Sequence, residues 1–250
     1  MNKYLKNLNR IEFVVTMACS GRCKHCSQGN HISNEHIDDV KAQQAIYDIC
    51  SHYNIDSLMT FGGEPLLYPE TVCKIHSAAR KMNIPQRELI TNGYFSKDIG
   101  RIKEVAHMLA QSGVNGICLS VDAFHQETIP LEYVKEFASA VVKEEISIHT
   151  HPAWLVSADD DNPYNLKTRE MLNEFSEMGI EQSSGNVIFP SGNALKYLGE
   201  YFDQDVEYNN PYRENPKDVK TISFSANGDV LCRNIYKDSI LEIMGSYSIT

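Results

Sequence analysis

Three cysteines stand within eight residues near the start of the chain, at a spacing suited to metal chemistry. Cys19, Cys23 and Cys26 follow the pattern Cys-x3-Cys-x2-Cys. Thiolates are soft donors that suit iron–sulfur clusters or zinc. Three of them are one ligand fewer than a closed tetrahedral zinc site or a fully protein-ligated cluster needs. A four-iron cluster held this way would keep one iron open to a small molecule.

Two simpler interpretations of the cysteines stay open on this stretch alone. Offsets of four and seven residues also place side chains on one helix face, so the cysteines could be buried in a helix. The polar run from Ser20 to Asn30 leaves no apolar stripe, which argues against a buried helix. A Cys₃His zinc site completed by His25 or His31 is the stronger alternative.

Composition and charge exclude several classes of protein. The chain has 250 residues, 42% of them hydrophobic, which is enough for a core and excludes global disorder. A net charge of −10 argues against a general nucleic-acid binder, which needs a basic face. No apolar run approaches the ~20 residues of a membrane span, and Met1–Arg10 is too polar for a signal peptide. We therefore expect a cytoplasmic protein, in which seven cysteines indicate metal or redox chemistry rather than disulfides.

The elements that must position the cysteines alternate between strand and helix. Strands are expected over Ile11–Thr16, Leu58–Phe61, Glu88–Thr91, Gly116–Asp122, Ile146–Val156 and Val187–Pro190. Helices are expected over Glu35–Tyr53, Glu70–Met82, Lys97–Ser112, Leu131–Lys143 and Leu166–Met178. This order predicts an α/β fold with a parallel sheet and right-handed crossovers, a partial (β/α)6 TIM-like barrel. We assign residues 1–195 to this core domain.

The sequence changes character after Ala194. Tyr201–Lys217 is rich in Asp, Asn, Pro and Tyr without a clear period, which predicts a loop or lid. A hairpin of Thr221–Ser225 with Val230–Cys232, turning at Asn227-Gly228, and a helix near Ser239–Met244 are expected to follow. Residues 196–250 therefore read as a short C-terminal hairpin and helix extension.

A second motif, Gly62-Gly63-Glu64-Pro65, follows the second expected strand. A double glycine after a strand is usually a turn. Glycines also let a ligand approach the backbone closely, and strand-edge carbonyls and Glu64 can accept hydrogen bonds from an ammonium group. Since the carboxyl ends of parallel strands meet at one mouth, we expect this loop beside the cysteine loop.

The order CSGRCKHC, GGEP, TNG and LSVDAFH resembles the radical S-adenosylmethionine (AdoMet) enzymes, over about Ile11 to Ala194. The resemblance implies one 4Fe–4S cluster on Cys19, Cys23 and Cys26, with AdoMet chelating the fourth iron. It implies that the GGEP stretch holds the methionine ammonium. It also implies that His25, before the last cysteine, packs near the adenine.

Further AdoMet contacts are expected from the strand ends. By strand parity, Cys118, Ser120 and Asp122 point into the barrel while Ile117, Leu119 and Val121 face the helices. Ser120 resembles a polar residue of the family near the ribose or carboxylate of AdoMet, and Asp122 has a similar position. The alternative, polar residues that merely cap a strand end, stays open. The remaining candidates are Asn92, His149 and His151, for which a structural role also stays open, and backbone of the turn Pro190–Ala194 near the adenine.

The other cysteines have less specific roles. Cys50 and Cys73 fall in expected helices and are most simply core residues. Cys118 is by default a buried small side chain, but a thiol inside the barrel could donate a hydrogen atom to a substrate radical. The segment around Cys232 resembles the opening of a SPASM extension, in which relatives carry auxiliary clusters. Because the partner cysteines are missing, we expect a single cluster.

The resemblance implies reductive cleavage of AdoMet to a 5′-deoxyadenosyl radical that abstracts hydrogen from a substrate. A flavodoxin or ferredoxin would supply the electron, and oxygen would destroy the cluster. The degenerate tail favours a peptide or protein substrate. A glycyl-radical enzyme activase, an enzyme acting on a small metabolite and a non-enzymatic zinc-binding module remain alternatives. The loops Asp159–Asp161 and Tyr201–Asp218 are expected to decide the substrate.

Overall fold

The computed structural model describes residues 2–29, 33–203, 206, 208, 210 and 214–249. His31, one of the two expected zinc-completing histidines, lies outside the described residues, as does part of the expected lid over Tyr201–Lys217. Among the described residues, no helix is long and apolar enough to cross a membrane.

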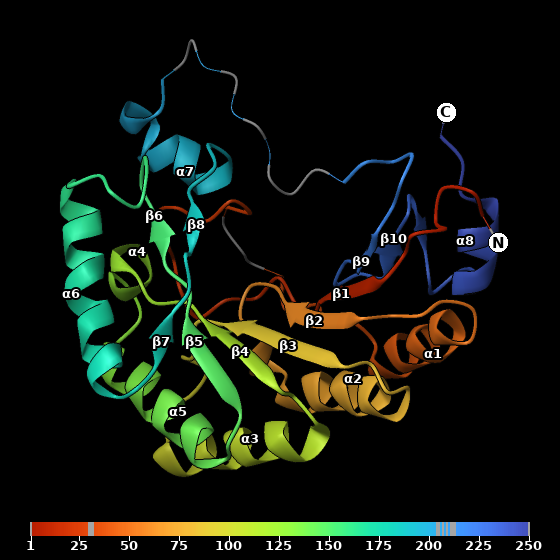
Figure 1. Ribbon diagram of the computed structural model, residues 1–250, viewed down its shortest axis with the longest axis horizontal. Helices are drawn as coiled ribbons and strands as arrows, with labels where there is room; N and C mark the ends of the chain where they lie inside the picture. Colours follow the sequence, from red (N-terminus) through yellow and green to blue (C-terminus); the bar gives the residue numbers. More distant parts are fainter. Residues whose placement is uncertain are drawn as a thin grey trace.

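A curved parallel sheet is the centre of the molecule (Figure 1). Its order is β7-β5-β4-β3-β2-β1-β9, and every neighbouring pair is parallel. The strands are β1 Arg10–Val14, β2 Ser57–Phe61, β3 Gln86–Thr91, β4 Gly116–Leu119, β5 Ser147–Thr150, β7 Glu181–Gln182 and β9 Thr221–Phe224. The sheet does not close, which confirms a partial barrel.

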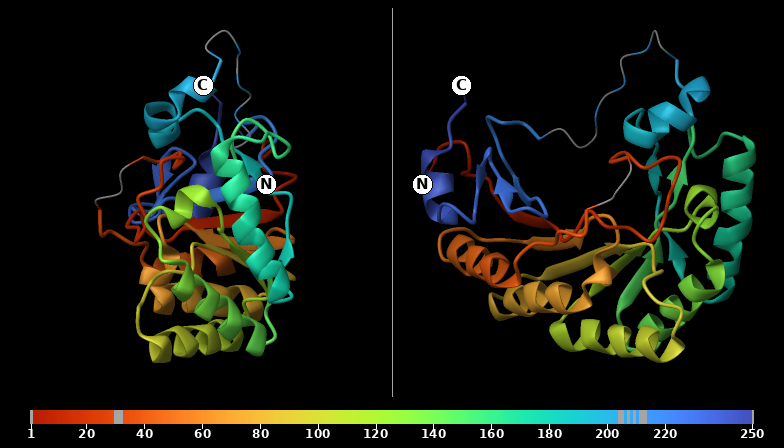
Figure 2. Two further views of the ribbon diagram at one scale, coloured as in Figure 1. Left: turned by 90° about the vertical axis from the view of Figure 1, so that its left-hand side faces the viewer. Right: turned by 180° about the vertical axis from the view of Figure 1, so that it is seen from behind.

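Helices cover the convex face of this sheet (Figures 1 and 2). The α-helices of the described residues are α1 Asp39–Cys50, α2 Pro69–Lys81, α3 Ile99–Ser112, α4 Ala123–Gln126, α5 Leu131–Lys143, α6 Pro163–Glu177, α7 Gly192–Tyr197 and α8 Ile240–Ser246. Of these, α7 lies apart from the outer layer, at the open end of the barrel (Figure 1). The expected helices are confirmed. Their ends follow local chemistry: Gly113 ends α3 in a left-handed conformation, and Ser239 begins α8 with a capping box.

Alternation along each strand separates the core from the cavity. In β1, Ile11 and Phe13 are fully buried in the main core, whereas Arg10 and Glu12 line the inner cavity. Ile117 in β4 belongs to the same core, and Cys118 lines the cavity. The parity predicted for the fourth strand is confirmed.

Two expected strands differ in the structure. The strand expected over Ile146–Val156 is divided at Pro152 into β5 and β6 Ala153–Trp154, since proline has no N–H for a ladder. β8 Asn186–Val187, at the expected sixth strand, pairs with β6 outside the main sheet. The place beside β5 belongs to Glu181–Gln182 instead. The assignment of Val187–Pro190 as the sixth sheet strand was therefore wrong.

The C-terminal hairpin and helix are present with different strands. β10 Asp229–Val230 pairs with β11 Arg233–Asn234, and α8 follows. The expected pairing of Thr221–Ser225 with Val230–Cys232 is wrong. Thr221–Phe224 forms β9, which lies beside β1 as the last strand of the sheet. Phe224 stacks on Phe13 with ring centroids 4.7 Å apart, and both rings are fully buried. Burial of this aromatic pair stabilises β9 beside β1 more than a local turn would stabilise a hairpin.

Candidate active site

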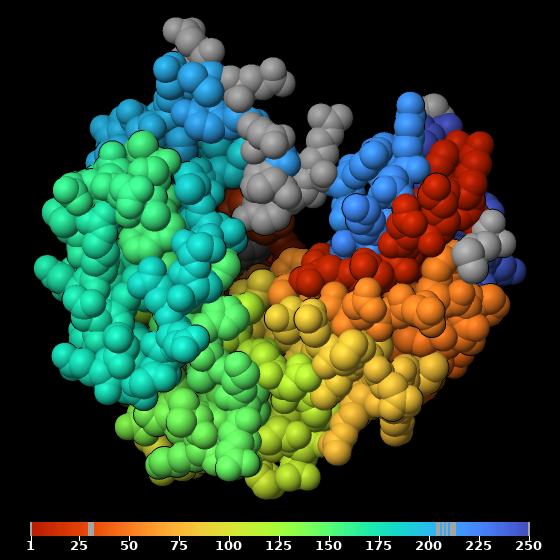
Figure 3. All heavy atoms as spheres, in the orientation of Figure 1, coloured from red at the N-terminus to blue at the C-terminus, as the bar shows by residue number. Residues whose placement is uncertain are grey.

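A cavity of about 1210 Å³ lies inside the curve of the sheet and reaches the cysteine loop. The space-filling view shows the molecule hollowed between β9–β10 on one side and β6, β8 and α7 on the other (Figure 3). All three candidate ligands line the cavity: Cys19, Cys23 and Cys26. The other predicted site residues that line it are His25, Gly62, Gly63, Asn92, Cys118, Ser120, Asp122 and His151.

The GGEP loop is packed directly on the chain that leads into the cysteine loop. Gly63 N–H donates to the Thr16 carbonyl and Glu64 N–H to the Ala18 carbonyl, both at 2.8 Å. A Cβ on Gly63 would lie 2.1 Å from the Ala18 oxygen, and one on Gly62 would lie 2.4 Å from the Thr16 oxygen. The two glycines are therefore required for this close backbone approach.

Glu64 fastens this loop to the end of β3. Its carboxylate accepts hydrogen bonds from Leu66 N–H at 2.9 Å, the Thr91 hydroxyl at 2.7 Å and Asn92 N–H at 2.8 Å. The side chain is fully buried, and burial raises the pKa of the Glu64 carboxyl to about 7. Glu64 is not among the residues lining the cavity, so the glycine backbone is what the loop presents there.

The Cys19 sulfur receives two N–H groups. Gly21 N–H donates to it at 3.4 Å and the Asn92 side-chain amide at 3.7 Å. Burial, followed by the Glu64 carboxylate, raises the pKa of the Cys19 thiol to about 11. Metal binding must therefore displace a proton, and the two N–H donors suit the thiolate that results. This donor set fits a cysteine-ligated cluster.

Cys23 lies against two imidazoles. The ligating atoms of Cys23, His25 and His125 all lie within 4.8 Å of one another. Burial raises the pKa of the Cys23 thiol, and burial lowers that of His25 to about 4. His125 was not among the predicted site residues, although it closes the LSVDAFH motif.

The start of α7 braces the cysteine loop from the other side. Asn193 donates from its side chain to the Cys23 carbonyl at 3.2 Å and from its backbone to the Cys26 carbonyl at 2.9 Å. Gly192, with φ of +53°, sits so close that a Cβ would lie 2.4 Å from the Ser27 oxygen. The expected turn Pro190–Ala194 thus contacts the cysteine loop, a role that no sequence signal indicated for Asn193.

The family model of the radical SAM superfamily matches residues 13–155 of this chain. The chain belongs to the radical SAM superfamily. Its members are enzymes that use a 4Fe–4S cluster and AdoMet. The matched residues hold the end of β1, the cysteine loop, the GGEP loop and the strands β2 to β6.

Curated relatives of this radical SAM chain share limited identity with it. A GTP 3′,8-cyclase of Desulforamulus reducens is 24% identical over 131 residues, which are 51% of this chain and 38% of that enzyme. A probable GTP 3′,8-cyclase of Saccharolobus islandicus is 20% identical over 220 residues, 82% of this chain and 68% of the relative. The chain thus spans 38% of the length of the first relative.

Solved structures share the fold. Native anSMEcpe with bound AdoMet superposes with a TM-score of 0.62 at 15% identity, covering 96% of this chain and 81% of that one. Streptococcus suis SuiB bound to precursor peptide SuiA gives 0.60 at 12% identity, covering 97% and 65%. BtrN in complex with AdoMet and 2-DOIA gives 0.54 at 14% identity, covering 95% and 82%.

Below the mouth, the barrel of this radical SAM chain is layered by strand register. Val14 pairs with Phe61, Ile90 with Cys118, and Cys118 with His149. Val14, Phe61 and Ile90 make this layer apolar, and Cys118 and His149 are its polar members. Cys118 is 8% exposed, and burial raises the pKa of its thiol to about 11, so the S–H is kept at neutral pH.

A charged layer lies one step deeper. Glu12 pairs with Met59 and Met59 with Glu88 in the sheet register. Arg10 forms an ion pair with Glu12 at 2.7 Å and approaches Glu88 at 3.9 Å. This group holds two carboxylates for one guanidinium.

The two histidines of the fifth strand region differ in their surroundings. His151 lines the cavity, but its Nδ1 bonds Ser183 Oγ at 2.8 Å and its Nε2 accepts from the Asn186 amide at 2.9 Å. Both ring nitrogens are therefore used in holding β8 near β5. His149 is half-buried and is not among the lining residues.

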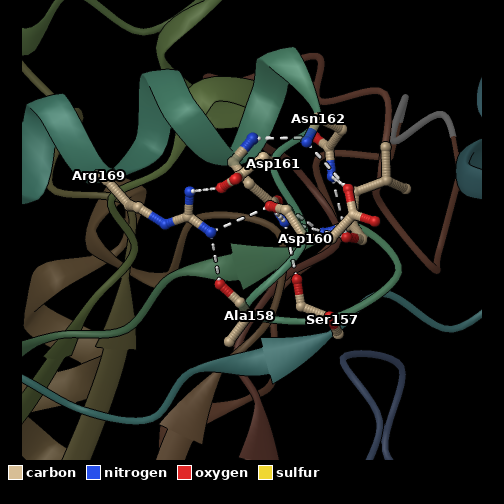
Figure 4. Close-up of polar contacts among 8 residues, drawn as sticks. Ser157, Ala158, Asp160, Asp161, Asn162 and Arg169 are labelled. Carbon is tan, nitrogen blue, oxygen red and sulfur yellow. Dashed lines mark hydrogen bonds and ion pairs between the residues drawn. The ribbon is translucent and has the colours of Figure 1, made fainter.

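The acidic loop expected to contact substrate is folded onto α6 (Figure 4). Arg169 forms an ion pair with Asp161 at 2.7 Å and donates to the carbonyls of Ala158 and Asp160. Buried Asn165, on the same helix, donates to the carbonyls of Leu155, Ser157 and Asp160. Asp159–Asp161 are not among the residues that line the cavity.

Cysteines outside the cluster motif are dispersed. Cys50 and Cys73 are half-buried and packed against the main core, as expected. Cys232 is exposed on the C-terminal segment between β10 and β11.

Proposed function

We propose that this chain holds one 4Fe–4S cluster on Cys19, Cys23 and Cys26 and acts on a peptide or protein substrate. The observation that carries the proposal is the convergence of the three thiols and the GGEP loop on one cavity. Cys19, Cys23 and Cys26 would hold the cluster, which would supply one electron, taken from a donor such as flavodoxin or ferredoxin, for cleavage of AdoMet to methionine and a 5′-deoxyadenosyl radical that takes a hydrogen atom from the substrate.

The residues for AdoMet follow from the wall of the cavity. The Gly62 and Gly63 backbone is offered for the methionine ammonium, with Glu64 as the anchor of that loop rather than the direct acceptor. Ser120 and Asn92, at neighbouring strand ends, are offered for the polar parts of AdoMet, and His25 for the adenine. Asp122, His149 and His151 have structural partners or stand back from the cavity, so we give them a supporting role.

The charge of the cavity supports a peptide over a nucleoside triphosphate. The basic residues among its described lining are Arg10 and Arg22. Arg10 is paired with Glu12, and Arg22 donates to the carbonyls of Cys19 and Gly21. The acidic residues of the described lining are Glu12, Glu35, Asp122, Glu214 and Asp229. A triphosphate needs clustered free cations, which this lining does not offer.

The test is dithionite-driven formation of 5′-deoxyadenosine by the anaerobically loaded enzyme. Peptides encoded beside the gene, GTP and small metabolites are each tested as substrates. The readout is the transfer of deuterium from the labelled substrate to 5′-deoxyadenosine. We expect deuterium in 5′-deoxyadenosine with a peptide and none with GTP. Transfer from GTP would refute the peptide assignment, and one zinc per chain without acid-labile sulfide would refute the cluster.

We further propose that Cys118 donates a hydrogen atom to the substrate radical, which leaves a thiyl radical that takes one electron from the external donor and a proton to restore the S–H. Its buried S–H lies one layer below Ser120, inside the barrel. Cys118→Ala should then still form 5′-deoxyadenosine and take deuterium from the substrate but release at least tenfold less product, while Cys73→Ala on α2 should behave like wild type. Unchanged product formation by Cys118→Ala would exclude this role.

A further inference from the structure

The last strand of the sheet, β9, has an edge without a partner among the described residues. It pairs with β1 on one side, and the order of the sheet ends there. Arg10 N–H donates to the Lys220 carbonyl, so in this parallel register the backbone of Ile222 also faces β1. The N–H and C=O groups of Thr221 and Ser223 therefore point away from β1, and no described residue bonds to them.

This edge borders the cavity. The side chains of Thr221 and Ser223 line the cavity, whereas Ile222 between them is fully buried on the opposite face. In the space-filling view, the hollow of the molecule lies beside β9 and β10 (Figure 3). β7, at the other edge of the sheet, has no residue in the described lining of the cavity. An unpaired edge is a template for a further strand, and a strand added to β9 would direct alternate side chains into the cavity.

The layer of the cavity next to Ser223 carries an excess of negative charge. Ser223 pairs in register with Glu12, whose carboxylate forms an ion pair with Arg10 at 2.7 Å. Arg10 also approaches the carboxylate of Glu88 at 3.9 Å, so one guanidinium serves two carboxylates. A strand added to β9 would lie about 10 Å from β1, a distance over which a long basic side chain and Glu12 can meet. A lysine or arginine in that strand would balance the charge of the layer.

We propose that the β9 edge binds an extended segment of the peptide substrate as an added strand, with a basic side chain directed toward Glu12. The inference rests on the proposed peptide substrate and names where it binds and one side chain that it carries. The backbone of Thr221 and Ser223 supplies hydrogen bonds that any sequence can use, and the cavity selects the side chain. A second copy of β9, with the sequence Thr-Ile-Ser-Phe, brings no basic side chain to this layer.

The first test measures binding of a blocked heptapeptide, Thr-Val-Thr-Lys-Thr-Val-Thr, to the anaerobically loaded full chain by fluorescence anisotropy. In an extended strand, alternate N–H groups face one neighbour, so only one set of them can bond to β9. One analogue is N-methylated at both valines, and the other at the second and third threonines. We expect one analogue to bind at least about tenfold more weakly than the parent peptide and the other to bind like it. Equal affinities of the two analogues, or no saturable binding of the parent peptide, would overturn the inference.

Ser223→Pro tests the same hydrogen bond from the side of the protein. It removes an N–H that β1 does not use, and proline is tolerated at such edge positions. Gln182→Pro is the matched control on β7: Ser183 N–H donates to the Thr150 carbonyl, so the N–H of Gln182 also faces away from its neighbouring strand. We expect the heptapeptide to bind about tenfold more weakly to Ser223→Pro and normally to Gln182→Pro. Equal affinities of these variants would contradict the role of β9. If Ser223→Pro does not fold, the two methylated peptides decide alone.

The basic side chain is tested by replacing the central lysine of the heptapeptide with norleucine, which removes the charge. The norleucine peptide should bind wild type at least about tenfold more weakly than the lysine peptide. Glu12→Gln removes the excess negative charge, so its affinities for the two peptides should agree within about threefold. Equal binding of both peptides by wild type would exclude the recognition of a basic side chain.

Further outcomes separate this inference from a dimer interface and from the proposed function. A wild-type dimer that Ser223→Pro converts to a monomer in sedimentation, without peptide binding, would assign the edge to a second copy of the chain and overturn the inference. Binding needs no radical, so an enzyme that forms 5′-deoxyadenosine with another peptide but shows no alternation between the methylated analogues contradicts the inference alone. A chain that binds the heptapeptide with the expected alternation but does not cleave AdoMet refutes the proposed function instead.

Discussion

Single side chains at the rim of the cavity fasten loops to one another. Glu64 joins the GGEP loop to β3, and Asn92 extends from β3 to the Cys19 sulfur. Asp122 joins α4 to the segment that begins with Ala153. These hydrogen bonds hold the groups that could bind a ligand in fixed positions. The side chains that make the bonds need not contact the ligand themselves.

Gly63→Ala tests the close approach beneath the proposed AdoMet site. The added Cβ would meet the Ala18 oxygen at 2.1 Å, so the GGEP loop must move away from the cysteine loop. We expect the affinity of the cluster-loaded enzyme for AdoMet to fall at least about tenfold, equivalent to about 1.4 kcal/mol. Equilibrium binding measures it. Gly199→Ala, with open space around the new Cβ, is the control and should bind normally.

His76 on α2 gives a pH dependence of stability away from the active site. It is fully buried and bonded to Thr60 Oγ1 at 2.9 Å, and burial lowers its pKa to about 3. Below about pH 6.5, the ordinary pKa of histidine, His76 binds a proton in the unfolded chain but stays neutral in the folded chain. Stability is therefore retained above pH 6.5 and falls by up to about 1.4 kcal/mol per pH unit as the pH drops toward 3.

Urea unfolding between about pH 7 and pH 5 checks this prediction. His76→Gln should show a shallower fall in the free energy of unfolding than wild type, because glutamine does not titrate. His52→Gln, at an exposed position, is the control and should keep the wild-type slope. Parallel slopes for wild type and His76→Gln would contradict the assignment.

At the scale of elements, the cysteine loop is held from several directions. The GGEP loop packs on its entry, and Thr128, just after α4, accepts a hydrogen bond from Arg22 N–H at 3.0 Å. α7 closes over its end through Asn193. A loop without regular structure can thus present three thiols at fixed positions because its neighbours supply its hydrogen bonds.

Gly192→Ala tests the contact with α7. Its Cβ would lie 2.4 Å from the Ser27 oxygen, at a φ of +53° that a side chain strains. We expect faster loss of iron to a chelator, by about tenfold or more, because the end of the cysteine loop is released. Absorbance of the chelated iron follows the rate. Leu195→Ala, an exposed position on the same helix, should release iron at the wild-type rate.

At the scale of the whole molecule, the two ends of the chain complete one edge of the sheet. β9 lies beside β1, and the two termini lie on the same side of the molecule (Figure 2). The side chain of Asn2 donates to the carbonyls of Met244 and Tyr247. The cavity is therefore walled partly by Thr221 and Ser223 from the C-terminal region. The segment after the matched family region contributes directly to the barrel.

Phe224→Ala tests this closure. Removing a fully buried ring that stacks on Phe13 should lower the free energy of unfolding by about 3–5 kcal/mol. Chemical denaturation measures the loss. Ser223→Ala is the matched control, one residue away and exposed, and should change stability by less than about 0.5 kcal/mol. A small effect of Phe224→Ala would mean that β9 is not an integral strand.

The sequence by itself determined most elements and the identity of the thiol loop. Helical periodicity predicted α1 through α6 apart from short α4, and parity in β4 placed Cys118 and Ser120 on the cavity side. Such signals are local, because each depends on residues within one turn or one strand. The family resemblance also came from contiguous motifs.

Only the tertiary structure decided which long-range partner each group takes. Thr221–Phe224 carries a hairpin signal, yet burial of Phe224 against Phe13 places it beside β1. Glu64 resembles a ligand acceptor, yet its carboxylate is used by Thr91 and Asn92. Such choices depend on contacts between residues far apart in the chain, whose energies no local pattern contains. For the same reason, the position of His125 beside Cys23 could be seen only after folding brought α4 to the cysteine loop.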